Sequence, residues 1–414
     1  MTVPELLAPA GNLEKLATAL AYGADAVYLG LDRFSLRARS GCLSLTELST
    51  ACALAQRHGR RLYLALNAFL HPGEEVDFRH LLEELRPLPV DAYIITDPAA
   101  LLMVREIDPD RPLHLSTQVN ITSAGAAQFW QHQGVKRLNL ARELTLEEIR
   151  AIRGRVTLEL EVFAHGALCV AYSGRCLLSA AMTGRSANRG ECAHPCRWNY
   201  AVQEETRPGE SFRIEEDVRG TYLFNSRDLR LIEHLPQLIE AGIDSLKIEG
   251  RMKSRYYVAA VTRVYRAALD AYRADPAGWC VDPLWLKELE TVSHRPYGSG
   301  FLFGRTDAGV HPADSRYRQS HLFIGVVLDD GGPHGWLVEG RNRFAVGEEL
   351  ELIGPAMRQV RFRLEGAWNE EGEPLNVIQP NARARLELPA GTRAGDLLRK
   401  VREGTITRPA NTVG

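Results

Sequence analysis

The sequence has no long apolar run and no recognisable export signal. No apolar stretch approaches the roughly 20 residues that a membrane-spanning helix needs. The first residues, MTVPELLAPAGN, lack the basic segment and the long apolar core of a signal peptide. An excess of one charge is missing too, because 50 Lys and Arg stand against 52 Asp and Glu. We therefore expect a cytoplasmic protein without a membrane anchor. The whole-chain charge neither indicates nor excludes nucleic-acid binding.

Cysteine is scarce and unevenly spread. The chain has seven cysteines, and four of them lie in CVAYSGRCLLSAAMTGRSANRGECAHPCR, residues 169–197. In a reduced protein, clustered thiols indicate a metal site or catalysis rather than disulfides.

Several catalytic motifs are absent as well. There is no His-Glu-x-x-His, no Gly-x-Ser-x-Gly and no P-loop, so nothing supports an ordinary zinc protease, a serine hydrolase or an NTPase.

Eight short apolar runs alternate with amphipathic stretches in the first part of the chain. Several are apolar nearly throughout, as expected of strands that are covered on both faces. They occupy residues 3–9, 25–30, 61–67, 91–97, 113–117, 137–141, 158–163 and 244–249. This alternation predicts an α/β fold, a (β/α)8 TIM-like barrel. An open doubly wound sheet is the alternative, but no dinucleotide-binding glycine fingerprint supports it.

The pattern changes twice along the chain. Residues 164–225 interrupt the alternation and carry the clustered cysteines, and helices are expected at about 226–241 and 253–273. Later, short apolar runs separated by Gly, Pro and Asn predict a small all-β domain that is closed as a barrel. We therefore predict a barrel domain at 1–294 with a Cys-rich insertion at 164–225, followed by a C-terminal β-barrel domain at 295–414.

The four clustered cysteines are the candidate metal ligands: Cys169, Cys176, Cys192 and Cys196. Four thiolates suit an iron–sulfur cluster or a tetrahedral zinc ion. Only the last two form the tight pair that is usual in zinc sites, so the spacing favours a cluster over zinc. Unliganded structural cysteines are a third interpretation. Cys42 follows the second strand on the side where barrel enzymes place their active sites, and it is a possible substitute ligand.

The same segment is basic, with four arginines against a single acid. Part of this charge would offset thiolates, and the rest would suit an anionic substrate, because Arg pairs with carboxylate or phosphate in a bidentate way. A solvated basic loop is the alternative. The arginines are Arg175, Arg185, Arg189 and Arg197, and the acid is Glu191.

Polar side chains end several predicted strands, where barrel active sites form. In LELEVFAHG, Glu161 lies on one strand face with His165 just beyond, and in SLKIEGR, Lys247 and Glu249 share a face. Acid, base and cation in one cavity suit proton transfer and anion binding. A structural ion pair is an equally good interpretation of any single member. The full set is Asn67, Asp97, Gln118, Asn120, Arg142, Glu143, Glu161, His165, Lys247, Glu249 and Arg251.

Long motifs resemble those of a known family. They are ELLAPAGNLEKLATALAYGADAVYLG, EVFAHGALCVAYSGRCLLS, NRGECAHPCRW and SLKIEGRMKSRYYVA. The chain resembles the collagenase-like peptidases whose catalytic type was left unknown. Older members were described as collagen-degrading proteases. Others are oxygen-independent hydroxylation proteins of tRNA, ribosomal RNA or ubiquinone synthesis. Several bind a 4Fe–4S cluster, and the RNA-directed ones depend on prephenate. FNSRDLRLIEHL followed by SLKIEGRMKS looks most like the tRNA-directed branch, which makes 5-hydroxyuridine at the wobble position.

The resemblance implies roles for named residues. The four clustered cysteines would hold the 4Fe–4S cluster, although some relatives have a cysteine where this chain has Arg230. Prephenate would be held by Arg142, Arg175, Arg185 and Arg197, together with Arg251. Apart from the resemblance, the strand-end pattern makes five residues the candidate catalytic set: Glu161, His165, Lys247, Glu249 and Arg251.

The resemblance also implies partners, namely tRNA, prephenate and an unidentified electron donor, and leaves the oligomeric state open. In the β domain, the basic runs RYRQS and PAMRQVRFR would contact tRNA phosphates, unless that domain serves only packing or dimerisation. The alternatives to tRNA hydroxylation are a peptidase and a hydroxylase of ribosomal RNA or a ubiquinone precursor.

Overall fold

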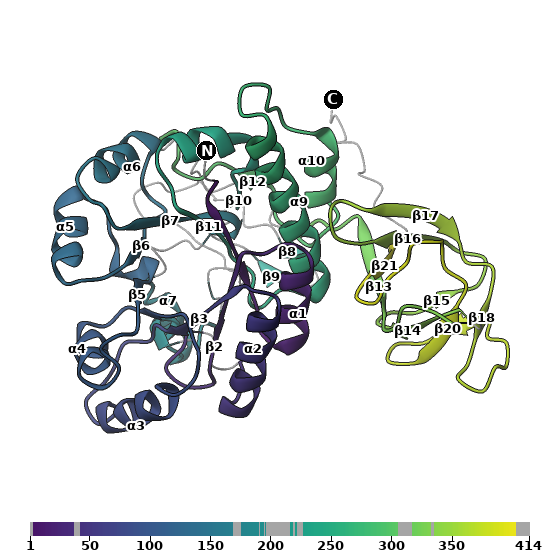
Figure 1. Cartoon of the computed structure of the whole chain (residues 1–414), viewed down its shortest axis with the longest axis horizontal. Coiled ribbons are helices and arrows are strands. Elements are labelled where there is room, and N and C mark those ends of the chain that lie inside the picture. The colour runs from purple at the N-terminus through teal and green to yellow at the C-terminus, as the bar shows by residue number, and fades with distance from the viewer. Residues whose placement is uncertain are drawn as a thin grey trace, which may run out of the picture.

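Two sheets organise the chain, a parallel barrel and an antiparallel sheet beside it (Figure 1). The computed structural model describes residues 3–36, 42–168, 175–189, 191–193, 195, 216–217, 220–221, 227–304, 317–332 and 335–402. In this part of the chain, no helix is both long enough and apolar enough to span a bilayer.

Eight parallel strands form a closed barrel. Strand β11 pairs with both β1 and β7, which joins the two ends of the sheet. The strands are β1 (Glu5–Pro9), β2 (Ala26–Gly30), β3 (Arg61–Leu66), β4 (Ala92–Ile95), β5 (Leu113–Leu115), β6 (Arg137–Asn139), β7 (Glu159–Ala167) and β11 (Ser245–Ile248). The predicted (β/α)8 barrel is therefore confirmed, and each of its strands lies within or across a predicted run.

Helices follow the strands and, apart from the one at Leu178–Thr183 in the cysteine segment, cover the outside of the barrel (Figure 1). They are α1 (Leu13–Ala21), α2 (Leu45–Arg57), α3 (Glu75–Leu85), α4 (Pro98–Ile107), α5 (Ala124–His132), α6 (Leu146–Arg153), α7 (Leu178–Thr183), α8 (Leu235–Glu240), α9 (Arg255–Ala274) and α10 (Pro283–Leu289). Seven of these ten helices begin at a short polar side chain that accepts a hydrogen bond from the first turn. At α6, Thr145 and Glu148 form a reciprocal capping box, which satisfies two backbone donors that the helix leaves open.

The helix expected at 226–241 is wrong in its first half. Residues Asp228–Arg230 form strand β10, which runs antiparallel to the far end of β7. Strand β7 is nine residues long and extends past its barrel neighbours, so it offers a free edge there. Helix α8 begins only at Leu235, with Pro236 in its first turn, and proline disfavours a helical residue before it. Strand β12 (Tyr297–Gly298) adds to the outer edge of β10.

The C-terminal part is an antiparallel sheet of seven strands with its own core. In sheet order the strands are β17 (Gln359–Arg363), β16 (Glu349–Ile353), β21 (Leu397–Val401), β13 (His321–Val327), β14 (Trp336–Gly340), β20 (Arg383–Leu386) and β18 (Ala367–Trp368). Two shorter strands, β15 (Phe344–Ala345) and β19 (Val377–Ile378), pair with each other. The predicted all-β domain is therefore present. The division of the chain at residue 295 stays a prediction.

A buried ionic cluster joins the β domain to the barrel. Arg399 on β21 contacts Glu288 on α10 at 2.7 Å and Glu351 on β16 at 2.9 Å. Arg263 on α9 reaches the same Glu288 at 2.6 Å. Burying these charges is costly unless each is paired. Because each of them has an ion-pair partner, the cluster can fix the position of one domain on the other.

Candidate active site at the barrel mouth

A buried arginine lies at the N-terminal end of the barrel strands. Arg137 on β6 is 2% exposed, and its guanidinium lies 2.6 Å from both Glu5 and Glu159 and 3.3 Å from Glu161. Burial lowers the pKa of Arg137, but the surrounding carboxylates raise it above its ordinary value, so it stays charged. Sequence reasoning missed this residue. The available signal was a charged residue at the start of the predicted strand at 137–141.

Glu161 and Lys247 meet above this arginine, as the strand pattern predicted. Lys247 Nζ lies 2.8 Å from Glu161 Oε1 and 4.5 Å from the centre of the Tyr28 ring. Burial favours a raised pKa for Glu161, but Lys247 and Arg137 outweigh it and lower the pKa overall. Glu161 is therefore an ionised counter-ion at neutral pH. In this arrangement it positions Lys247 and has no proton to give.

A cavity of about 100 Å³ opens above this pair at the C-terminal ends of the strands. Six of the predicted residues line it: Asn67, Gln118, Arg142, Lys247, Glu249 and Arg251. We call this cavity the mouth pocket. Among its described lining residues, three cationic side chains face a single carboxylate, Glu249, which accepts a hydrogen bond from the Tyr28 hydroxyl at 3.2 Å. An excess of positive charge in a half-closed cavity favours an anionic ligand.

The two arginines of the mouth pocket are held in fixed positions. The Arg142 guanidinium lies 3.9 Å from the centre of the Phe163 ring, and its Nη1 donates to the Ala167 carbonyl at 3.3 Å. Arg251 is 5% exposed and donates from Nη1 to Ser35 Oγ at 3.0 Å. A Cβ atom on Gly30 would lie 2.4 Å from that same Nη1, so the absent side chain leaves room for Arg251. Guanidinium groups held in fixed positions suit carboxylate binding.

Asn139 is a further polar group of the mouth pocket that sequence reasoning did not single out. It is 2% exposed, and its Oδ1 has no hydrogen-bond partner within the described structure. Buried polar atoms are normally paired, so an unpaired acceptor beside a cavity is suited to a ligand donor. Asn139 ends the three-residue strand β6, which is too short for its alternation to reveal which face it occupies.

His165 lies outside the mouth pocket. It is 1% exposed and packs between three tyrosines, with Nδ1 3.5 Å from the Tyr265 hydroxyl and Nε2 3.5 Å from the Tyr297 hydroxyl. The pairing of β11 with β7 shifts register between Lys247 and Ile248, so the simple alternation of faces fails there. Burial lowers the pKa of His165 well below its ordinary value. The imidazole is therefore neutral, and its position gives no support to a role in the mouth pocket.

Two other predicted strand-end residues lie at the start of a helix and at the end of a turn. Asp97 caps α4, accepting hydrogen bonds from the N–H groups of Ala99 at 2.8 Å and Leu70 at 3.0 Å. Asn120 ends a short 3-10 turn with a φ of 58°, a left-handed conformation that Asn adopts more readily than most residues. Neither lines the mouth pocket.

The described part of the cysteine segment lies against the mouth pocket. Arg175 donates from Nε to the Gln118 carbonyl at 2.8 Å, and Ala187 lines the pocket itself. Cys176 directly follows Arg175 and therefore lies next to the rim of the mouth pocket. Its Sγ accepts a hydrogen bond from the Leu178 N–H at 3.4 Å. Arg185, by contrast, is exposed and not among the lining residues.

The predicted ligand set is described only in part. Cys176 and Cys192 are half-buried, as is the possible substitute Cys42. Cys169, Cys196 and Arg197 lie outside the described residues. Within the described ranges, no three Cys, His, Asp or Glu side chains gather at metal-binding distance. Cys176 and Cys192 offer soft thiol donors, and Cys176 Sγ lies beside a backbone N–H, which fits the chemistry of an iron–sulfur ligand.

The basic run at 355–363 is already engaged within the β domain. Arg358 pairs with Asp396, and Arg361 lies 2.8 Å from Glu351. Contact of these arginines with tRNA stays a prediction, and it would have to compete with the internal carboxylates.

Comparison with known proteins identifies the family. Residues 11–312 match Peptidase family U32, and residues 319–399 match the Peptidase family U32 C-terminal domain. The chain therefore belongs to peptidase family U32, the collagenase-like family that its motifs resemble.

Named relatives of two kinds are similar over most of the chain. The tRNA hydroxylation protein P1 of Bacillus subtilis is 38% identical over 382 residues, covering 91% of this chain and 89% of the relative. The tRNA hydroxylation protein P of Escherichia coli is 38% identical over 419 residues, covering 91% and 92%. A collagenase of Porphyromonas gingivalis is 30% identical over 384 residues, covering 87% and 91%.

Proposed function

We propose that this chain is a tRNA-hydroxylating enzyme that converts the wobble uridine to 5-hydroxyuridine in the cytoplasm. The similarity to two tRNA hydroxylation proteins supports the substrate class, because it extends over about nine tenths of each chain and so includes both domains. The observation that carries the proposal to a site is the mouth pocket, with Arg142, Lys247 and Arg251 around one cavity.

Prephenate is the proposed co-substrate of the mouth pocket. It carries two carboxylates, and the pocket offers two fixed guanidinium groups and one ammonium group against a single carboxylate. The rings of Tyr28 and Phe163 form apolar walls for its ring. Asn139 Oδ1 would accept a hydrogen bond from the prephenate hydroxyl. These residues bind and orient the co-substrate, while Glu161 and Arg137 hold Lys247 in place from below.

The chemistry needs a redox partner as well. Replacing hydrogen by hydroxyl on uridine C5 is an oxidation, so the reaction needs an oxygen source and a route for electrons. A 4Fe–4S cluster on Cys169, Cys176, Cys192 and Cys196 would supply one-electron transfer when bound, and a separate electron carrier would exchange electrons with it. The reacting base would have to leave the anticodon stack to reach the mouth pocket, as in other enzymes that act on a base.

The test is nucleoside mass spectrometry of total tRNA from cells that lack the gene, grown without oxygen so that oxygen-dependent hydroxylases stay silent. The strain is complemented with the wild-type chain, with Cys176→Ala, or with the control Cys280→Ala, which removes an exposed thiol outside the cysteine segment. We expect 5-hydroxyuridine and its derivatives to disappear on deletion and to return with the wild-type chain and the control only.

Other outcomes point to the alternatives. Unchanged tRNA on deletion contradicts the proposal and returns attention to ribosomal RNA, to ubiquinone precursors and to peptide hydrolysis. If deletion abolishes tRNA hydroxylation and Cys176→Ala restores it fully, tRNA is still the substrate. The Cys176 thiol is then not needed for the reaction.

A further inference from the structure

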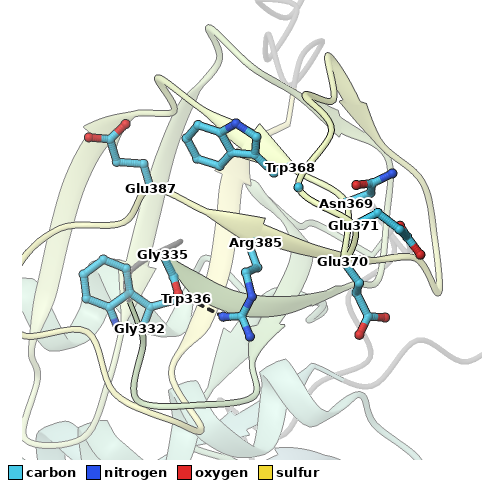
Figure 2. A pocket seen from close by; sticks show the side chains of 10 residues that line it. Gly332, Gly335, Trp336, Trp368, Asn369, Glu370, Glu371, Arg385 and Glu387 are labelled. Atoms are coloured by element: carbon cyan, nitrogen blue, oxygen red, sulfur yellow. Dashed lines mark hydrogen bonds between the residues drawn. The ribbon is translucent and has the colours of Figure 1, made fainter.

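The β domain has a larger pocket of its own, remote from the barrel strands in sequence. Its volume is about 680 Å³, which is within the range of small-molecule sites. We call it the tryptophan pocket. Figure 2 shows Trp336 and Trp368 on one side, the turn at Asn369–Glu371 on the other, and Arg385 between them. The remaining lining residues are Gly332, Gly335, Gly372 and Glu387.

Carboxylates without partners surround the tryptophan pocket. Glu370, Glu371 and Glu387 are exposed, and none has a side-chain hydrogen bond or ion pair within the described structure. The single lining cation is already engaged, because Arg385 Nη1 contacts Asp329 Oδ2 at 3.3 Å and donates to the Gly335 carbonyl at 3.1 Å. The pocket therefore has an excess of negative charge that no described neighbour neutralises.

The local backbone holds these groups in place. Strand pairing puts Trp368 on β18 directly opposite Arg385 on β20, so their side chains share a face. The turn after β18 is closed by Asn369, whose Oδ1 accepts the Glu373 N–H at 2.8 Å. Gly372 has a φ of 86°, which favours glycine there. This turn presents Glu370 and Glu371 at its tip.

Glycines also fix the two indole rings. A Cβ atom on Gly366 would lie 2.4 Å from the Trp368 ring, and one on Gly331 would lie 2.8 Å from Trp336 Nε1. Each ring therefore packs against bare backbone, at a distance that a side chain would not allow. Both tryptophans are half-buried, which leaves part of each ring for a ligand.

We propose that the tryptophan pocket binds a flexible organic polycation of the polyamine class. Ammonium groups are attracted both to carboxylates and to the faces of indole rings. The methylene chain between the ammonium groups would cover the apolar ring surface. A bare metal ion would not explain two indoles, which offer it no ligand atoms, and an anion would meet the three carboxylates. The same repulsion disfavours a nucleotide, because its phosphate would lie beside Glu370, Glu371 or Glu387.

The test is isothermal titration calorimetry of spermidine into the full chain. Trp368→Ala should weaken binding about tenfold, and Trp368→Phe should keep most of it, since the cation–π contribution at such sites is on the order of 1–2 kcal/mol. Glu387→Gln should weaken binding about threefold, and added salt should weaken it further. Glu365→Gln is the matched control, an exposed glutamate outside the pocket that should change nothing.

Titrations of two further ligands test whether the bound cation comes from a protein segment and whether a nucleotide binds instead. A diarginine peptide that binds more tightly than spermidine, with the same dependence on Trp368, supports the cation site and indicates a basic protein segment as its source. Adenosine monophosphate that binds more tightly than spermidine overturns the proposal. So does spermidine binding that is absent, or that Trp368→Ala and Glu387→Gln leave unchanged.

Discussion

The two pockets of this chain have opposite charge and are built in opposite ways. In the mouth pocket, Lys247 and Arg251 are buried, Arg142 is half-buried, and the protein holds each of them with an ion pair or a hydrogen bond. In the tryptophan pocket, carboxylates are exposed on a turn and a strand end, and no described neighbour pairs with them. The mouth pocket therefore holds positive charge within the fold, whereas the tryptophan pocket exposes negative charge on the surface.

This difference predicts in which pocket a substitution changes the stability of the fold as well as ligand binding. Removing a partner from a buried ion pair leaves an uncompensated charge in a low-dielectric interior, which is strongly destabilising. Removing an exposed carboxylate leaves nothing stranded. Substitutions in the mouth pocket should therefore affect both stability and activity, whereas those in the tryptophan pocket should affect ligand binding alone.

The largest effect is expected at the base of the mouth pocket. Lys247→Met removes the nearest counter-ion of Glu161 and leaves Arg137, at 3.3 Å, as its remaining ionic partner. We expect the free energy of unfolding to fall by about 3 kcal/mol, with loss of tRNA hydroxylation. The double variant Glu161→Gln/Lys247→Met should regain at least about half of that stability without regaining activity. Urea unfolding and nucleoside analysis measure the two properties separately.

A surface pair of the same chemistry provides the control for Lys247. Lys400 pairs with Glu348 in the β domain, where both side chains are partly exposed. Lys400→Met should cost no more than about 1 kcal/mol. Equal losses for Lys247→Met and Lys400→Met would contradict the distinction between buried and displayed charge.

The next largest effect is expected from Arg142, which contacts the proposed co-substrate directly. Arg142→Ala should raise the dissociation constant for prephenate about 10- to 100-fold, because a charge-assisted hydrogen bond contributes on the order of 1.5–3 kcal/mol. Spermidine binding should stay within about twofold, because the two pockets share no side chain. The exposed Arg155→Ala is the matched control and should alter neither ligand. Calorimetry in which Arg142→Ala and wild type bind prephenate equally would remove Arg142 from the site.

A smaller effect is expected from acid. Hydrogen bonding by His321 and pairing with Arg361 and Arg399 outweigh burial and lower the pKa of Glu351, and ion pairing likewise lowers the pKa of Glu288. The unfolded chain therefore binds protons more readily at these carboxyls. Their stabilisation is present above the ordinary glutamate pKa of about 4.3 and is lost as pH falls below it.

Two neighbouring glutamates on β16 test this pH dependence. Glu351→Gln should flatten the loss of unfolding free energy between about pH 5 and pH 3, whereas Glu349→Gln, an exposed neighbour two residues away, should leave it unchanged. Denaturant midpoints at several pH values measure the slope. Identical slopes for Glu351→Gln and wild type would show that the interface cluster does not contribute.

Strand ends could be predicted from the sequence wherever a strand was long and regular. Lys247, Glu249 and Arg251 follow one another at the end of β11, so the barrel rule was enough to bring them to the mouth. Arg137 and Asn139 were missed because β6 has only three residues and shows no alternation. His165 was expected at the mouth from the regular alternation of strand faces. The register shift that turns it toward α9 cannot be recognised in the sequence.

The tryptophan pocket could not be predicted from the sequence at all. Trp336 and Trp368 are far apart in the chain and come together only through β20, which pairs with both of their strands. Their fixed positions depend on Gly331 and Gly366, and glycines in a loop-rich β domain read as ordinary turn residues.

The most direct measurement compares the two pockets in cells. A deletion strain grown without oxygen is complemented with the wild-type chain, with Arg142→Ala or with Trp368→Ala, and 5-hydroxyuridine is quantified in total tRNA. We expect Arg142→Ala to restore less than about a tenth of the wild-type level, in keeping with a lost charge-assisted contact, and Trp368→Ala to restore most of it. Full restoration by Arg142→Ala, or tRNA that does not change on deletion, would contradict the assignment of the mouth pocket to tRNA hydroxylation.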